Sequence, residues 1–192
     1  EAGKESCFGA NNIFKNFENV NIYHKAISLK EGQIKLYHQS NHPKLVIDNN
    51  GNRQLVNSNA GHGGGSSIYD SKGNVLKDFY ELVDGIKFSN FLKEEHIELD
   101  NAINIVKINI EGAEWDFFTD LIDNNLHKKI HIFCGQGHDV EKIKEFTDNG
   151  TDKKYFELLK KNNIILHRFT EHKQEQNVNM KNLIQNILNT LN

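Results

Sequence analysis

The chain has 192 residues, of which 37% are hydrophobic and 26% charged, and its formal net charge is −3. These values are typical of one globular domain that is long enough to bury a core. The small net charge gives no electrostatic reason to expect nucleic acid or a membrane surface as a partner. No apolar run approaches the roughly 20 residues of a membrane-spanning helix, and no signal-peptide pattern opens the chain.

The two cysteines, Cys7 and Cys134, form neither a disulfide framework nor a metal-ligand spacing. This usage favours a reducing, cytoplasmic compartment, and the sequence leaves room for a homo-oligomer. The chain begins with Glu1, and its only methionine is Met180. We therefore expect the sequence to be a processed product or a fragment.

The first half of the chain predicts mainly strands. Residues 18–28 carry apolar side chains in alternation, and residues 33–38 alternate more clearly. Residues 44–56 place two short apolar runs around Asn50-Gly51, which predicts a β-hairpin. A long glycine-rich loop is expected over residues 59–74.

A strand that enters a helix is expected over residues 85–95, with Ser89 as the N-cap. The continuous β-branched run "NIVKINI" (104–110) predicts a strand that is covered on both faces of a parallel sheet. Gly112 ends this run, and residues 113–124 place Trp115, Phe118, Leu121 and Ile122 on one stripe of a helix.

The second half continues this alternation. A buried strand is expected over 128–135, helices near 139–147 and 152–162, and a further strand over 163–169. Apolar residues at helical spacing predict a C-terminal amphipathic helix over 178–191.

Alternating strands and helices predict one α/β domain over residues 1–192, with a mostly parallel, doubly wound sheet, an inserted β-hairpin and a glycine-rich loop. Ligands of such sheets bind at the carboxyl ends of the strands. Glu111, Gly112 and Glu114 follow one strand there, and "CGQGHD" (134–139) follows the next. The alternative is that Gly112 only turns the chain and the glutamates favour the dipole of the following helix.

The stretch "INIVKINIEGAEWDFF" (103–118) resembles the hallmark of the FkbM-like methyltransferases, which use S-adenosylmethionine and have a Rossmann-like, class I methyltransferase fold. The matching positions are Lys107, Ile108, Asn109, Glu111, Gly112, Ala113, Glu114 and Trp115. Weaker similarities lie in the same order at residues 19–37, at "GGGSSIY" (63–69) and at "IKFSNFL" (86–92), so the resemblance covers roughly residues 1–140.

Two departures from the family pattern stand out. Asn109 occupies a position where the family more often has Asp, which puts any charge or metal role of that carboxylate in doubt. The family's glycine-rich cofactor turn has no counterpart, because "CFGANN" (7–12) lies too close to the next strand to allow a crossover. On this alignment the first strand and its turn lie upstream, and Glu1 is the acid that binds the ribose hydroxyls.

The resemblance implies methyl transfer from S-adenosylmethionine to a hydroxyl of a sugar or glycoconjugate precursor. The transfer needs an aligned acceptor and a general base, for which the candidates are His138 and Glu111. The cofactor-binding residues would be Glu1, Lys25, Ala26 and Ile27. The substrate-binding residues would be His62, Ser66, Ser67 and Glu114. No metal ligand is assigned.

Other functional classes are less well supported by the residues. "HGGG" (62–65) is similar to an oxyanion loop of esterases, but the chain has no Gly-x-Ser-x-Gly motif and no P-loop. "HKKIH" (127–131) lacks the glutamate base of zinc hydrolases. The remaining alternative is a non-catalytic, methyltransferase-like module that binds a glycan or a protein partner.

Overall fold

The structure is a computed structural model, and it describes residues 1–39, 45–47, 53–55, 65–168, 181–182, 184–185 and 189. The helices are α1 (Lys4–Phe14), α2 (Phe88–Glu94), α3 (Glu114–Asp123), α4 (Lys144–Asn149) and α5 (Thr151–Lys161), with the 3-10 helices η1 (Leu126–Lys129) and η2 (Asp139–Lys142). The strands are β1 (Ala26–Ile27), β2 (Gly32–Gln39), β3 (Leu45–Ile47), β4 (Arg53–Leu55), β5 (Val75–Ile86), β6 (Ile105–Ile108), β7 (Ile132–Gly135) and β8 (Leu166–Arg168). The chain is therefore α/β, as the sequence predicts.

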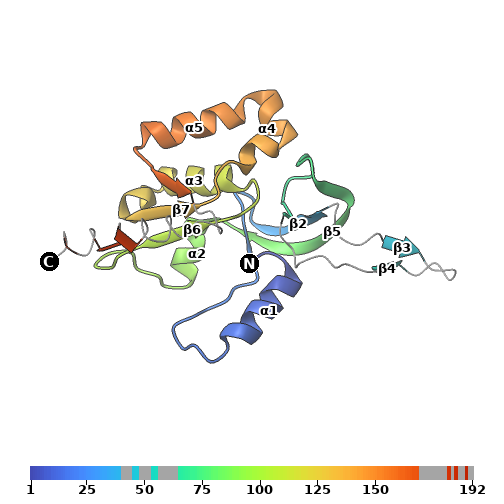
Figure 1. Cartoon of the computed structure of the whole chain (residues 1–192), viewed down its shortest axis with the longest axis horizontal. Coiled ribbons are helices and arrows are strands. Elements are labelled where there is room, and N and C mark those ends of the chain that lie inside the picture. Colours follow the sequence, from blue (N-terminus) through green and yellow to red (C-terminus); the bar gives the residue numbers. More distant parts are fainter. Residues whose placement is uncertain are drawn as a thin grey trace.

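The parallel part of the fold is a three-stranded sheet with the order β6-β7-β8. Its strands alternate with helices, and in Figure 1 α3, α4 and α5 lie on one side of β6 and β7 while α2 lies on the other. All four residues of β7 are buried, as expected for a central strand. The expectation for β6 was wrong, because Ile105 is 44% exposed and Lys107 is exposed. β6 is an edge strand of this sheet in the part that the structure describes.

A second three-stranded sheet has the order β1-β5-β2 and is mixed. β1 is parallel to β5, whereas β2 pairs with β5 antiparallel from Gly32 opposite Gly85 to Gln39 opposite Val75. Among the described residues the two sheets are separate, so the single doubly wound sheet that we expected is not seen there. The sequence pattern also missed residues 75–84 of β5. Charged side chains interrupt the apolar alternation of this segment, and the strand is held by its long pairing with β2.

Residues 18–25 do not form the expected strand, and only Ala26 and Ile27 do so. A strand needs a partner for its backbone groups, and the described contacts of this segment provide little of one. The Glu1 amino group donates to the Tyr23 carbonyl (3.0 Å), and the Lys25 N–H donates to the Glu1 carbonyl (3.2 Å). These two bonds form one isolated step of parallel pairing.

The predicted hairpin is confirmed, since β3 and β4 pair antiparallel with Leu45 opposite Leu55. Residues 65–74 form turns, as expected for the loop, and they are attached to the body of the protein at two bridges. Ser67 pairs with Tyr37 of β2, and Lys72 pairs with Ile143 next to η2. The loop therefore connects the mixed sheet to the helices that follow β7.

The main core lies between the parallel sheet and its helices. Phe118, Leu121, Val140, Ile143 and Tyr155 have no exposed surface. A smaller core between β1, β2 and β5 contains Ala26, Leu36 and Val83. The expected stripe of α3 is only partly right. Phe117 is buried with Phe118 and Leu121, whereas Trp115 and Ile122 are half-buried.

The expected N-cap at Ser89 was wrong. Lys87 is the N-cap of α2, and Ser89 lies in the first turn, where its N–H and its hydroxyl both donate to the Asp120 carboxylate (2.7 Å each). The Asp120 carboxylate of α3 therefore accepts a backbone N–H that would otherwise be unpaired at the start of α2.

Most of residues 178–191 lie outside the described residues, and those described there are helical. None of the helices in the described ranges is both long and apolar enough to cross a membrane.

Candidate functional site

The candidate site lies at the carboxyl ends of β6 and β7. Glu111 follows β6 with a positive φ of 55°, and Gly112 follows with a φ of 108°. The backbone angle at position 112 favours glycine, and a side chain there would meet Ile143 Cδ1 at 2.7 Å and force the Ile143 side chain to shift. This turn places the backbone of Glu111 at the strand end and leads directly into α3.

Glu114 is the first residue of α3, and its side chain has no exposed surface. Its Oε2 accepts the Gly112 N–H (2.8 Å), and its Oε1 has no hydrogen-bond partner. Burial, reinforced by the charges of Asp139 and Glu111, raises the pKa of this carboxyl to about 7. The expected contact of Glu114 with an acceptor remains a prediction. In this structure its buried side chain stabilises the turn between β6 and α3 by accepting the Gly112 N–H.

Lys72, from the loop, is buried against these strand ends, and its side chain has no exposed surface. Its ammonium donates to a carboxylate oxygen of Glu111 and to the Gly65 carbonyl (3.2 Å). It also lies 3.3 Å from Asp139 Oδ2. A lysine ammonium has three N–H donors, and these three acceptors match that number.

Asp139 begins η2 just after β7 and is almost completely buried. Besides Lys72, it pairs with Lys142, whose ammonium is 2.7 Å from Asp139 Oδ1. The neighbouring His138 has a half-exposed ring, and its Nε2 lies 3.7 Å from Asp139 Oδ1. This separation is longer than a hydrogen bond, so the structure leaves the His138 ring accessible and without a hydrogen bond to Asp139.

The two carboxylates that pair with Lys72 differ in acidity. Burial raises the pKa of Glu111, the hydrogen bond with Lys72 opposes this, and Asp139 adds to the increase, so the pKa of Glu111 lies above its usual range. Burial alone would raise the pKa of Asp139 as well. However, hydrogen bonds with Lys142 and Glu111 and the charge of Lys72 lower that pKa overall. Asp139 is therefore the stronger acid of the two and Glu111 the weaker one.

The loop residues are divided between structural and accessible positions. Ser67 is buried, its hydroxyl donates to the Glu111 carbonyl (2.8 Å), and it accepts the Tyr69 N–H (3.2 Å). Ser66 is half-buried, and its hydroxyl is 3.4 Å from Nδ1 of His38. The structure thus brings Ser67 to the backbone of Glu111, and the expected contacts of Ser66 and Ser67 with an acceptor remain predictions. His62 lies outside the described residues.

The predicted cofactor-binding residues lie on and beside the other sheet. The exposed carboxylate of Glu1 accepts the Gly3 N–H (3.1 Å), and the Glu1 carbonyl accepts the Lys25 N–H (3.2 Å). The Lys25 ammonium is 3.6 Å from Glu94, Ala26 is buried, and Ile27 packs against the main core. The structure brings Glu1 and Lys25 together, and Ala26 and Ile27 follow them in β1.

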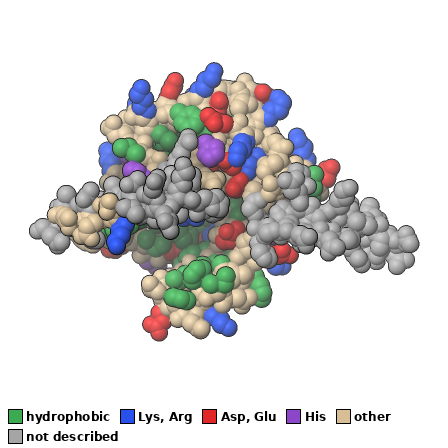
Figure 2. All heavy atoms as spheres, viewed as in Figure 1, with side chains coloured by type: hydrophobic (Ala, Val, Ile, Leu, Met, Phe, Trp, Pro, Cys, Tyr) green, Lys and Arg blue, Asp and Glu red, His purple; other side chains and the backbone are tan. Residues whose placement is uncertain are grey.

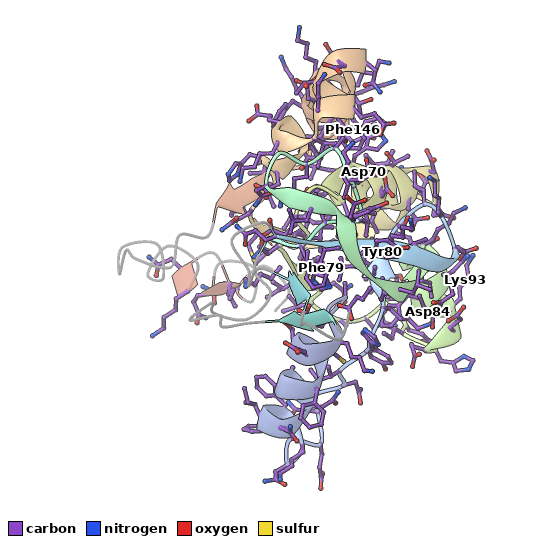
Figure 3. All side chains as sticks on the ribbon, turned by 90° about the vertical axis from the view of Figure 1, so that its right-hand side faces the viewer. Asp70, Phe79, Tyr80, Asp84, Lys93 and Phe146 are labelled. Atoms are coloured by element: carbon purple, nitrogen blue, oxygen red, sulfur yellow. The ribbon has the colours of Figure 1, made fainter. Side chains whose placement is uncertain are left out.

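Asp116, in the first turn of α3, connects the two sheets. Its carboxylate accepts the Leu29 N–H (2.9 Å) and the Ser28 hydroxyl (3.3 Å), which follow β1. Its other oxygen accepts the Tyr69 hydroxyl (2.5 Å) from the loop. The Tyr69 ring also contacts Phe146 of α4 at a centroid distance of 4.7 Å, and Figure 3 labels Phe146 close to Asp70 of the loop.

Sequence reasoning missed Lys72, Asp116 and Tyr69. Asp139 stood in the quoted segment after β7 and was given no role, although its position at a strand end was a usable signal. Lys72 left no signal, because a lysine in a polar loop is expected to be exposed. Within the part of the chain that the structure describes, no group of three His, Cys, Asp or Glu side chains is placed to hold a metal ion.

These features define an α/β protein with a parallel sheet and a charged, partly buried cluster at two adjacent strand ends. Comparison of the chain with protein-family models, with curated proteins and with solved structures gave no match.

A separate groove lies beside α1. Its volume is about 330 Å³, and it is lined by side chains from the end of α1 and from the segment that follows. Large apolar side chains are exposed on and after this helix: Phe8 (70%), Ile13 (69%), Phe14 (39%) and Phe17 (55%). Figure 2 shows hydrophobic side chains gathered over α1 at the lower end of the molecule.

Proposed function

We propose that this chain carries the catalytic side of an S-adenosylmethionine-dependent O-methyltransferase with a Rossmann-like fold. The acceptor would be a hydroxyl of a sugar or glycoconjugate precursor. The sequence resemblance over residues 103–118 motivates the proposal. The observation that carries it is the position of Glu111, a carboxylate at a parallel-strand end with a side chain 19% exposed, backed by buried Lys72 and Asp139.

Bound S-adenosylmethionine would supply a methyl group on a positively charged sulfur. That sulfur would keep the electron pair of the C–S bond when the acceptor oxygen bonds to the methyl carbon. The task of the protein is to orient the acceptor and to remove the proton of its hydroxyl. The Glu111 carboxylate would accept this proton, and Lys72 would stabilise the ionised form that can do so. His138, with Asp139 behind it, is the alternative acceptor of the proton.

The residues expected to hold the cofactor fit it in part. Glu1 presents an exposed carboxylate, which is suited to the two ribose hydroxyls, at the parallel-type step beside Lys25. Ala26 and Ile27 follow in β1 and would form an apolar wall. We assign the ribose to Glu1, and we assign no residue of the chain to the methionine portion.

Calorimetric titration of S-adenosylmethionine tests this proposal most directly. We expect the protein to bind S-adenosylmethionine. A panel of nucleotide sugars, followed by release of S-adenosylhomocysteine, would then identify the acceptor class. Absence of binding would refute the enzymatic proposal.

We place the protein in a reducing, cytoplasmic compartment. Cys7 and Cys134 are both buried and free, which supports this placement. Sedimentation of the purified protein would measure whether it forms a homo-oligomer.

The second candidate function is a non-catalytic module that binds a glycan. The exposed rings of Phe14 and Phe17, at a centroid distance of 5.8 Å, and the groove beside α1 favour this candidate. Aromatic faces with neighbouring amides are suited to sugar rings. Glycan binding that Phe17→Ala abolishes and Glu111→Gln leaves unchanged would favour the module over the enzyme.

A further inference from the structure

Lys72 occupies an unusual position for a lysine. Its side chain has no exposed surface, although it belongs to a loop between two polar segments. Burying an ammonium is costly unless hydrogen bonds and opposite charges replace the water it loses. The Gly65 carbonyl, the Glu111 carboxylate and the Asp139 carboxylate provide this replacement.

The backbone around Lys72 is fixed independently of its side chain. The Lys72 N–H donates to the Tyr69 carbonyl (3.3 Å), and the Gly73 N–H donates to the Lys142 carbonyl (3.2 Å). Lys72 also forms an antiparallel bridge with Ile143, which is fully buried. The ammonium is therefore aimed at the strand ends from a well-anchored position.

The three partners of the ammonium belong to different parts of the fold. Gly65 is the first described residue of the glycine-rich loop, Glu111 follows β6, and Asp139 follows β7. One side chain thus links the loop to both strand ends. An ion pair that only stabilised the core would not require a partly exposed partner such as Glu111, nor the carbonyl of Gly65. Buried ion pairs also contribute little net stability to a fold.

We propose that Lys72 is a positioning residue that orients the Glu111 carboxylate toward the acceptor and ties the described part of the glycine-rich loop to it. This inference rests on the proposed function for its chemical meaning. The contacts themselves are a property of the fold, and they can be tested without S-adenosylmethionine.

The electrostatic consequence follows from all the charged groups around Glu111. Lys72 favours its ionised form, whereas burial and Asp139 disfavour it, and the charge of Glu111 in turn raises the pKa of Glu114. Lys142 faces the same carboxylates from η2. Because Lys72 alone among these groups bonds directly to Glu111 through a positive charge, its removal leaves Glu111 among carboxylates and strongly favours the protonated form.

The experiment is a pH titration of side-chain carboxyl carbons by NMR, with the Glu111 signal assigned by its loss in Glu111→Gln. In Lys72→Met we expect the titration midpoint of Glu111 to rise by about one to three pH units. The matched control is Lys77→Met, which changes a lysine that is 68% exposed on β5, and we expect no shift there. An unshifted midpoint in folded Lys72→Met would overturn the proposal.

Lys72→Arg tests the proposal if Lys72→Met does not fold. It keeps the positive charge and changes the donor geometry, so we expect the Glu111 midpoint to stay within about half a pH unit of the natural value. Loss of the bond to the Gly65 carbonyl should speed amide exchange about tenfold at Ser67, whose N–H donates to the Tyr37 carbonyl (2.9 Å). Unchanged exchange at Ser67 would overturn the link to the loop.

The transfer reaction supplies a separate readout once an acceptor is known. A positioning role predicts that Lys72→Arg lowers kcat about tenfold or more and leaves the KM for S-adenosylmethionine within about twofold. The expected titration behaviour without any methyl transfer would refute the proposed function and support the coupling of Lys72 to Glu111.

Discussion

The ammonium of Lys72, which is fully buried, donates to the carboxylate of Glu111, whose side chain is 19% exposed. This contact joins the loop to the end of β6, and it places the most accessible carboxylate of the cluster beside the only lysine that the cluster encloses completely.

Glu111→Gln should abolish most methyl transfer and leave the fold intact. The amide can still accept from Lys72, but it cannot take a proton from an acceptor hydroxyl. Removing a general base typically lowers the rate about 100-fold to 10,000-fold. Thermal unfolding should change little, and Glu141→Gln, an exposed glutamate of η2, is the control for both measurements. Full turnover of Glu111→Gln would exclude Glu111 as the base.

His138→Ala separates the two candidate bases. The ring is half-exposed and contacts Asp139 only at 3.7 Å, so its removal should leave stability within about 0.5 kcal/mol. If His138 orients the acceptor beside Glu111, the transfer rate should fall about tenfold, less than for Glu111→Gln. His131→Ala, an exposed histidine before β7, is the matched control. If the transfer rate falls further in His138→Ala than in Glu111→Gln, His138 is the base and Glu111 is the residue that orients the acceptor.

Glu114 should make the protein less stable as the pH rises. Its folded pKa is raised to about 7 from an ordinary value of 4.5, so the folded state keeps a proton that the unfolded state loses between these values. The stability from this group is complete below pH 4.5 and is lost as the pH rises toward 7.

Glu114→Gln should remove this dependence, because the amide is always neutral. Relative to the natural protein, the variant should gain on the order of 1 to 3 kcal/mol at pH 8 compared with pH 4.5. Urea unfolding at both pH values measures the difference. Glu157→Gln, an exposed glutamate of α5, should show no such change. An identical pH profile for Glu114→Gln and the natural protein would contradict the assignment.

Gly112→Ala should destabilise the site turn. The φ of 108° is strained for any L side chain, and the new Cβ would lie 2.7 Å from Ile143 Cδ1. We expect a loss of about 1 to 3 kcal/mol of unfolding free energy. Gly9→Ala in α1 is the opposite control, because nothing lies within 4 Å of its added Cβ. An alanine inside a helix should stabilise by about 0.5 to 1 kcal/mol, so equal effects of the two variants would refute this explanation.

Asp116→Asn should weaken the connection between the two sheets. The carboxylate accepts from the Leu29 N–H and from the hydroxyls of Ser28 and Tyr69, and an amide can replace only part of this set. We expect a loss of about 1.5 to 3 kcal/mol in urea unfolding. Asp123→Asn, at the exposed end of α3, should cost less than about 0.5 kcal/mol. If Asp116→Asn leaves the free energy of unfolding unchanged, the two sheets are held together by packing alone.

The sequence by itself determined the local elements. The β-hairpin, strand β7 and helices α3 and α5 follow from turn chemistry and from apolar periodicity, which act over a few residues. It also placed Glu111, Gly112 and Glu114 at a strand end, since a parallel strand that meets a glycine before a helix can end in few other ways.

Only the tertiary structure decided which strands pair and which charges meet. Residues 18–25 have strand-like alternation and too few backbone partners, whereas β5 lacks clear alternation and pairs along most of β2. Lys72 and Glu111 are 39 positions apart, so no local pattern predicts their contact. The packing of the whole chain brings the partners of Lys72 around its ammonium. It also buries Glu114 and so raises the pKa of that carboxyl, because desolvation depends on what the rest of the chain packs around a group.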